Sequence, residues 1–141
     1  KMCIIMIKGV RRIFLPKIED IRGNLSFFEN NNQLPFKIQR TYWIYDVPDG
    51  EVRGGHSFKK SHELIVALSG SFSVVLNDGK NEFIYYLNRS YYGLYVPNLI
   101  WRSLDDFSTN SLALITSNIE YNPQDYITNF KEFMALKSEN E

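Results

Sequence analysis

Residues 62–79, HELIVALSGSFSVVLNDG, decide the fold. The stretch opens with a run rich in apolar residues and is broken by Ser69-Gly70, which is a turn signal. At the start of 71–76, small polar residues alternate with large apolar ones, the period of a strand that buries one face. Asp78-Gly79 then favours a tight hairpin turn. The stretch therefore predicts neighbouring antiparallel strands.

The same pattern extends along the chain in both directions. Further turn signals stand at 48–50, 88–90 and 97–98. They separate runs rich in β-branched and aromatic residues at 36–45, 83–87, 91–96 and 111–116. Such spacing predicts many short antiparallel strands, and a two-sheet jelly roll protects strand edges better than one open sheet does. We therefore expect an all-β fold.

One helix is expected at the C-terminal end. Asn122 can cap a helix and Pro123 can occupy its first position. Apolar residues then recur at helical spacing, at Tyr126, Ile127, Phe130 and Phe133. We predict a helix over 122–135 that packs on the sheets, followed by a solvated tail over 136–141.

Composition limits the domain count and the partners. With 141 residues, the chain fits one domain, 1–141, with a single core. Its formal net charge is zero, so nothing attracts nucleic acid non-specifically. Cys3 is the single cysteine, which rules out an internal disulfide and favours the reducing cytoplasm.

The first residues are apolar but form too short a run for a membrane segment. Residues 1–7, KMCIIMI, are far fewer than the about 20 that a spanning helix needs, and no cleavage site follows them. We expect no membrane association. Residues 1–10 are interpreted as an edge strand, with Lys1 ahead of Met2 resembling a remnant of protein expression.

The segment 56–70 resembles the first motif of the cupins, His-x-His, three or four residues, Glu, six residues, Gly. His56, Glu63 and Gly70 match this pattern, and Phe58 stands where the second His would be. The second cupin motif is echoed by GLYVP at 93–97 and by Trp101-Arg102. The resemblance implies that the jelly roll is a cupin double-stranded β-helix with one C-terminal α-helix.

The departures from the cupin motifs argue against a metal site. A transition metal needs three or four converging ligands, and two of the four cupin ligand positions hold Phe58 and Arg102. His56, His62 and Glu63 could form a weaker site, but adjacent strand residues face opposite sides, so His62 and Glu63 cannot both point inward. We expect no metal and no cofactor.

A closer resemblance covers about 14–135. Its motifs follow the order found in dTDP-4-keto-6-deoxyglucose 3,4-ketoisomerases. They are DIRGNL at 20–25, FKIQRTYWI at 36–44, RGGH at 53–56, GLYVP at 93–97, Trp101-Arg102 and DFS at 106–108. These cupin enzymes are related to the rhamnose-pathway 3,5-epimerases. The resemblance implies conversion of the dTDP-linked keto sugar into a 3-keto sugar, on the way to 3-amino-3,6-dideoxy sugars. It also implies a homodimer formed by exchange of N-terminal strands.

Two other functions stay open. A dTDP-sugar 3,5-epimerase would share the motif RGGH at 53–56. A non-catalytic carbohydrate-binding cupin is suggested by Phe58, because a phenyl ring cannot move a proton.

The chemistry of a 3,4-ketoisomerase needs a base for the C3 proton and an acid for C4. By resemblance His56 is the base, and an imidazole suits both roles because its ordinary pKa lies near neutrality. With Phe58 in place of the second His, three interpretations remain: His56 serves both carbons, Tyr42 supplies the second proton, or the activity is lost or altered.

Arginines are the expected ligands of the substrate's negative charges. Arg40, Arg53 and Arg102 are candidates for the pyrophosphate and for the developing oxyanion. The resemblance implies that Arg22 reaches the nucleotide across a dimer interface. The sequence leaves the product's configuration at C4 open, and we expect Arg22 and Arg102 to influence it. Trp101 is a candidate for stacking on thymine or the sugar.

Overall fold

The structure, a computed structural model, describes residues 7–140. Its strands are β1 (Arg11–Phe14), β2 (Lys17–Ile18), β3 (Leu25–Ser26), β4 (Arg40–Tyr45), β5 (Arg53–Phe58), β6 (Glu63–Ser69), β7 (Phe72–Asn77), β8 (Glu82–Leu87), β9 (Tyr92–Val96), β10 (Trp101–Asp105), β11 (Leu112–Ser117) and β12 (Tyr126–Ile127). The helical segments are the 3₁₀ turn η1 (Pro123–Asp125) and the helix α1 (Phe130–Glu139).

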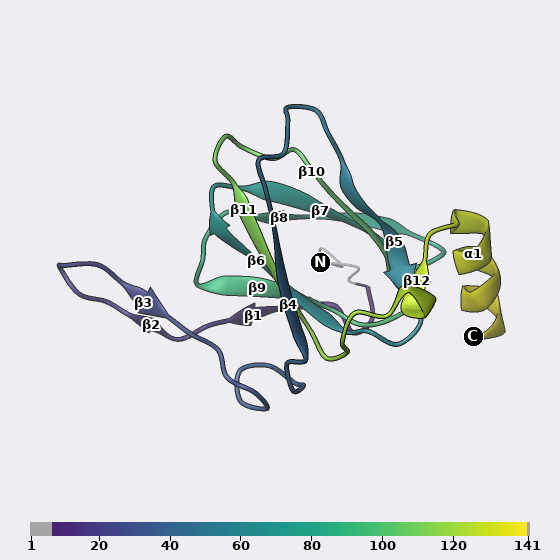
Figure 1. Cartoon of the computed structure of the whole chain (residues 1–141), viewed down its shortest axis with the longest axis horizontal. Coiled ribbons are helices and arrows are strands. Elements are labelled where there is room, and N and C mark those ends of the chain that lie inside the picture. The colour runs from purple at the N-terminus through teal and green to yellow at the C-terminus, as the bar shows by residue number, and fades with distance from the viewer. Residues whose placement is uncertain (1–6, 141) are drawn as a thin grey trace, which may run out of the picture.

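The strands form two five-stranded antiparallel sheets. One has the order β1-β9-β6-β11-β4 and the other β12-β5-β10-β7-β8, while β2 and β3 pair only with each other. Figure 1 shows the two sheets facing one another, the β2–β3 hairpin projecting from one side, and α1 at the opposite side. The predicted all-β jelly roll with a C-terminal helix is confirmed.

Strand β6, at the centre of the first sheet, is buried on both faces over most of its length. Ile65 and Ala67 of β6 point into the main core between the sheets, whereas Leu64 and Val66 join a second apolar cluster on the outer face. Leu34 and other residues outside the sheet complete that second cluster. Two-sided burial explains why β6 is a continuous apolar run and does not alternate like a half-exposed strand.

The C-terminal helix differs from its prediction in position. Asn122 caps only the 3₁₀ turn η1, and Tyr126 and Ile127 then pair with Phe58 and Ser57 as strand β12. The α-helix starts at Phe130, after a new cap whose Asn129 side chain accepts a hydrogen bond from the Glu132 amide at 3.1 Å. Strand pairing with β5 thus overrides the helical spacing. Most of the predicted tail, up to Glu139, belongs to this helix.

The predicted edge strand over 1–10 is also displaced. Residues 1–6 lie outside the described part, and 7–10 contain a turn instead of a strand. The first described strand is β1, which pairs with β9 from Arg11 to Phe14. No helix within residues 7–140 is long and apolar enough to cross a membrane.

Candidate functional site

Polar side chains from four strands converge between the sheets. Along β4 exposure alternates, and Arg40 and Tyr42 occupy positions on the face turned toward the other sheet. Glu63 on β6 and Arg102 on β10 each stand two residues before a core residue of the same strand. His56 on β5 lies directly across from Arg102 in the strand register. The fold therefore gathers residues far apart in the sequence.

The centre of the cluster is a closed group of three side chains. Arg102 Nη1 and Glu63 Oε1 form an ion pair. The Tyr42 hydroxyl donates to Glu63 Oε2 at 2.7 Å and accepts from Arg102 Nη2 at 2.7 Å. Glu63 is 1% exposed and Arg102 2% exposed, so both charges have left water and depend on each other.

Burial sets the protonation of this group. It raises the pKa of Glu63, although the positive charge of Arg102 pulls in the opposite direction. Burial likewise raises the pKa of Tyr42, so the phenol keeps its proton at neutral pH. The described arrangement is a protonated phenol that donates to a carboxylate held by a guanidinium.

His56 lies beside this group in a cationic, largely buried environment. Burial, followed by the positive charges of Arg102 and Arg40, lowers its pKa to about 3. Its Nε2 atom is buried and has no hydrogen-bond partner within residues 7–140. The imidazole is therefore uncharged at neutral pH and can accept a proton, but its pKa lies well below the ordinary value on which the sequence-based expectation rested.

Phe58 supports both the imidazole and the guanidinium. Its ring meets the His56 ring edge-on with centroids 4.8 Å apart, and the Arg102 guanidinium carbon lies 5.1 Å from its centroid. Tyr126 closes the group from β12, at 5.0 Å from His56 and 4.7 Å from Phe58. Phe58 thus occupies the position of the motif's second His with an apolar ring that packs against His56 and Arg102.

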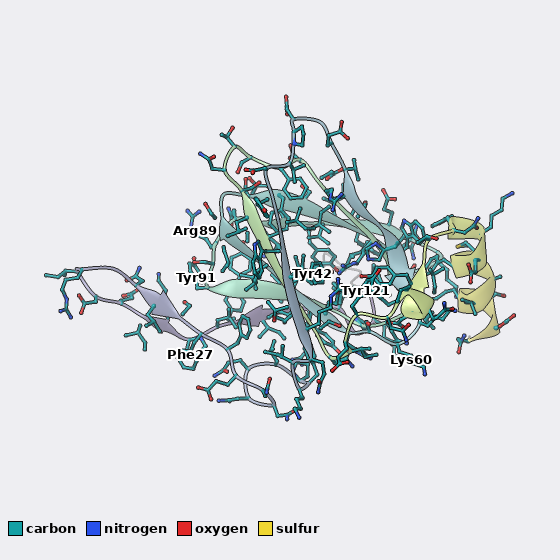
Figure 2. All side chains as sticks on the ribbon, viewed as in Figure 1. Phe27, Tyr42, Lys60, Arg89, Tyr91 and Tyr121 are labelled. Atoms are coloured by element: carbon teal, nitrogen blue, oxygen red, sulfur yellow. The ribbon has the colours of Figure 1, made fainter. Side chains whose placement is uncertain are left out.

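Arg40 forms the polar boundary of the cluster. Its guanidinium carbon lies 4.4 Å from the ring centroid of Tyr42 and 4.9 Å from that of Tyr121, and its Nη1 donates to the Tyr126 hydroxyl at 2.8 Å. Figure 2 labels the Tyr42 and Tyr121 side chains, which lie between strand β4 and strand β12 in this view. Three tyrosines therefore hold one cation at the edge of the site.

A β-bulge brings Arg53 to the same face as His56. On β10, Arg102 pairs with His56 and Leu104 pairs with Arg53. Two steps along β10 therefore match three steps along β5, so β5 carries one extra residue. Gly54 adopts a φ of +74°, a conformation that glycine allows. Because directly opposed residues share a face, Arg53 lies on the inward face at the exposed end of the strand. It borders an open pocket of about 410 Å³ that is lined by the end of β4 and the following loop and does not reach His56 or Arg102.

The structure leaves two predicted site residues outside the cluster. Arg22 is exposed on the projecting hairpin and hydrogen-bonds to Asp20 at 2.9 Å. Trp101 packs against α1, with its ring centroid 5.2 Å from that of Phe130 and 5.8 Å from that of Phe133. Trp101 thus contacts the C-terminal helix and does not line the polar cluster.

Glu63, Tyr121 and Tyr126 are members of the cluster that sequence reasoning missed. Glu63 was considered only as a metal ligand, because strand alternation places His62 and Glu63 on opposite faces without deciding which of them points inward. His62 faces the other way, with Nδ1 2.6 Å from the Tyr95 hydroxyl. Tyr121 precedes the 3₁₀ turn and no pattern marks it, whereas Tyr126 fits a helical period that predicted a helix and hid its place on strand β12.

The donor set does not fit a cupin metal. The Glu63 carboxylate is already paired with the Arg102 cation, which stands where metal-binding cupins place a ligand. Within residues 7–140, no group of three or more His, Cys, Asp or Glu side chains is placed to hold a metal ion.

Comparisons with known proteins point to one family. Residues 8–138 match the family model described as "FdtA: WxcM-like, C-terminal". A curated relative from Aneurinibacillus thermoaerophilus, TDP-4-oxo-6-deoxy-alpha-D-glucose-3,4-oxoisomerase, is 38% identical over 122 residues, covering 84% of this chain and 88% of that protein.

Solved structures of similar proteins agree. A histidine-to-asparagine variant of the 3,4-ketoisomerase QdtA from Thermoanaerobacterium thermosaccharolyticum, in complex with TDP-4-keto-6-deoxyglucose, has a TM-score of 0.93 at 32% identity, covering 95% of this chain and 97% of that one. The TDP-quinovose 3,4-ketoisomerase WlaRB from Campylobacter jejuni has a TM-score of 0.87 at 37% identity, covering 92% and 99%. The rmlC epimerase of Mycobacterium tuberculosis, at 18% identity and a TM-score of 0.73, covers 86% and 69% and shares the fold.

Proposed function

This chain belongs to the WxcM-like, C-terminal (FdtA) family, and on that premise we propose that it is a TDP-sugar 3,4-ketoisomerase. As an isomerase it converts TDP-4-keto-6-deoxyglucose into a TDP-3-keto-6-deoxyhexose for 3-amino-3,6-dideoxy sugar synthesis. The observation that carries the proposal is the uncharged His56 imidazole, whose buried Nε2 lacks a partner within residues 7–140 and lies next to two guanidinium groups. An uncharged imidazole can accept a carbon-bound proton, and it does so best once its pKa is brought back toward the operating pH in the substrate complex.

The proposed reaction uses His56 on both carbons. Its Nε2 removes the C3 proton, the C3–H electrons form the 3,4-enediolate, and the resulting imidazolium returns a proton to C4. Tyr42 is less suited to the C4 proton because its hydroxyl donates to Glu63. The cations Arg40 and Arg102 stabilise the negative charge that develops on the oxygens.

Arg53 and Arg40 are proposed to bind the pyrophosphate. Arg53 is exposed at the rim and shares the inward face of β5 with His56, so its guanidinium can hold phosphate oxygens while the sugar lies deeper. The negative charge of the bound pyrophosphate would also offset the guanidinium charges that lower the pKa of His56.

A homodimer would complete the site with Arg22. The projecting β2–β3 hairpin exposes Ile18, Ile21 and Leu25, with Ile21 105% exposed, and an apolar arm of this kind favours burial against a second copy. We infer exchange of N-terminal strands, with Arg22 of each hairpin contacting the nucleotide in the partner.

The proposed enzyme uses no metal and no cofactor. The isomerisation moves only protons and is redox-neutral, and the Glu63 carboxylate is engaged by Arg102. We assign the reaction to the cytoplasm, because a chain with one cysteine suits a reducing compartment.

The test is to incubate the purified protein with TDP-4-keto-6-deoxyglucose in deuterated water and to follow the reaction by NMR. We expect a 3-keto product with deuterium at C4, and a His56→Asn variant slower by about 10² or more. The coupling between H4 and H5 in the product gives the C4 configuration. A wild-type protein that neither converts the sugar nor exchanges its protons would overturn the proposal.

The same spectra separate the two alternatives. A 3,5-epimerase would exchange the proton at C5, but the epimerase likeness lies at 18% identity and supports the fold alone. A non-catalytic binding cupin would bind TDP and leave the sugar unchanged in both wild type and His56→Asn.

A further inference from the structure

We propose that Glu63 temporarily accepts a proton from Tyr42, and that the two residues together transfer the oxygen-bound proton of the substrate from O3 to O4. This inference rests on the proposed ketoisomerase function. It assigns to the buried carboxylate a positioning and relay role that acts through Tyr42.

The isomerisation has to move two protons. One leaves C3 to His56, and His56 delivers one to C4 after the proton on its imidazolium has exchanged with solvent. The substrate also has a hydroxyl at C3 and a carbonyl at C4, whereas the product has the reverse, so a second proton must pass from O3 to O4. His56 has a single buried nitrogen without a partner among the described residues, and it is occupied by the carbon proton.

Tyr42 has the hydrogen bonds that such a relay needs. A phenol offers one donor and two acceptor positions. In this structure the donor is used by Glu63 Oε2 at 2.7 Å and one acceptor position by Arg102 Nη2 at 2.7 Å. The remaining acceptor position can take a proton from a substrate hydroxyl only as the phenol passes its own proton to Glu63.

The steps balance without any other reactant. As His56 removes the C3 proton, the C3–H electrons form the C3–C4 double bond and the C4 carbonyl becomes an oxyanion. The O3 proton moves to the Tyr42 oxygen while the Tyr42 proton moves to the Glu63 carboxylate. The O3 electrons then form the C3 carbonyl, C4 takes the proton from His56, and the Glu63 proton returns through Tyr42 to O4.

The ion pair with Arg102 gives the temporary protonation of Glu63 an electrostatic effect on the reaction. While Glu63 is a carboxylate, it neutralises Arg102. When Glu63 accepts the proton, the Arg102 cation loses its partner at the moment when the enediolate carries its negative charge. The buried pair therefore delivers positive charge to the transition state without any movement of side chains.

The test measures carbon exchange and net conversion separately. In deuterated water, NMR gives the rate at which the C3 proton of recovered 4-keto substrate is replaced and the rate at which 3-keto product forms. For Glu63→Gln we expect conversion to fall by about 10² or more and C3 exchange to fall much less, because His56 stays intact. The ratio of exchange to conversion therefore rises. A parallel fall of both rates would assign Glu63 a purely structural role and overturn the proposal.

A second variant keeps the test decisive if Glu63→Gln folds poorly. Tyr42→Phe removes the relay oxygen but leaves the Glu63–Arg102 ion pair in place, and it should raise the same ratio. An unchanged ratio in Tyr42→Phe contradicts the relay. A wild-type protein that shows neither C3 exchange nor formation of the 3-keto product would instead refute the ketoisomerase function itself.

The matched control is the other buried carboxylate, Asp125. It accepts from the Lys60 and Ser61 amides at 2.7 and 3.1 Å and touches neither Tyr42 nor Arg102 through a hydrogen bond. Asp125→Asn makes the same carboxylate-to-amide change, and it should leave the exchange-to-conversion ratio at its wild-type value. A raised ratio in this variant would show that any buried carboxylate has the effect, and would overturn the assignment to Glu63.

Discussion

Arg102 and Glu63 form an ion pair between the two sheets, with the side chains 2% and 1% exposed. Each charge is compensated mainly by the other, and Tyr42 is the further hydrogen-bond partner of both. The same contact therefore bears on stability and on the chemistry of the site.

Removing one member of the pair should destabilise the fold. Arg102→Met leaves the Glu63 carboxylate buried without its cation, and we expect a loss of about 3–5 kcal/mol in the free energy of unfolding. Urea denaturation followed by tryptophan fluorescence measures it. The double variant Arg102→Met with Glu63→Leu should recover much of that loss, because it buries no unpaired charge. A double variant as unstable as the single one would assign the loss to packing around the guanidinium.

The titration of His56 should be displaced far to the acid side. Its pKa in the free protein is lowered to about 3, so the imidazole gains its proton only in strong acid, whereas a histidine with a pKa of 6.5 is mostly protonated at pH 5. In ¹H NMR, the His56 ring protons should keep their neutral-form shifts from pH 8 to pH 5. His62→Gln identifies the signal, since the chain has 2 histidines. Bound TDP should raise this pKa, and a midpoint near 6.5 in the free protein would contradict the burial of the ring.

Ile21 should matter only to an assembled dimer. It is 105% exposed in the single chain, so Ile21→Asp should leave the folding of that chain unchanged and shift the protein from dimer to monomer in size-exclusion chromatography with light scattering. Ile84→Asp, at a 68% exposed position on β8, is the matched control and should keep the wild-type mass. A wild-type protein that is monomeric would refute strand exchange.

Arg22 should contribute to nucleotide binding and little to folding. Within its own chain it hydrogen-bonds to Asp20 on an exposed hairpin, whereas a charge-assisted contact to the nucleotide is worth about tenfold or more in affinity. Calorimetry with TDP should therefore show weaker binding for Arg22→Ala at an unchanged melting temperature. Arg89→Ala alters another exposed arginine, labelled in Figure 2, and should bind TDP normally. Equal affinities for both variants would exclude Arg22 from the site.

Restoring the motif's second histidine should slow this enzyme. Phe58 is 4% exposed and contacts His56, Tyr126 and the Arg102 guanidinium, so Phe58→His would replace an apolar platform with a buried polar ring beside a cation. We expect a lower rate of 3-keto formation, with Phe58→Leu as the control for lost aromatic contacts. A faster Phe58→His variant would mean that the pocket still has room for a second catalytic imidazole.

Much of the fold was readable from local pattern. Turn signals and apolar runs predicted β6, β7, β8, β9 and β11 within a few residues, because the two-residue period of a strand is a property of neighbouring side chains. The C-terminal segment was less readable. Tyr126 and Ile127 fit a helical period, but their backbone pairs with Phe58 and Ser57, which are distant in the sequence.

The sequence by itself determined the jelly roll, since turn signals and apolar runs at short, regular spacing mark its strands, and the resemblance of its motifs implied the family and the role of His56. Only the tertiary structure decided that Glu63 joins Tyr42 and Arg102, and that a bulge at Gly54 places Arg53 on the face of His56. Both outcomes depend on the register between strands far apart in the chain. That register is set by burial across the whole core, and no local pattern records it.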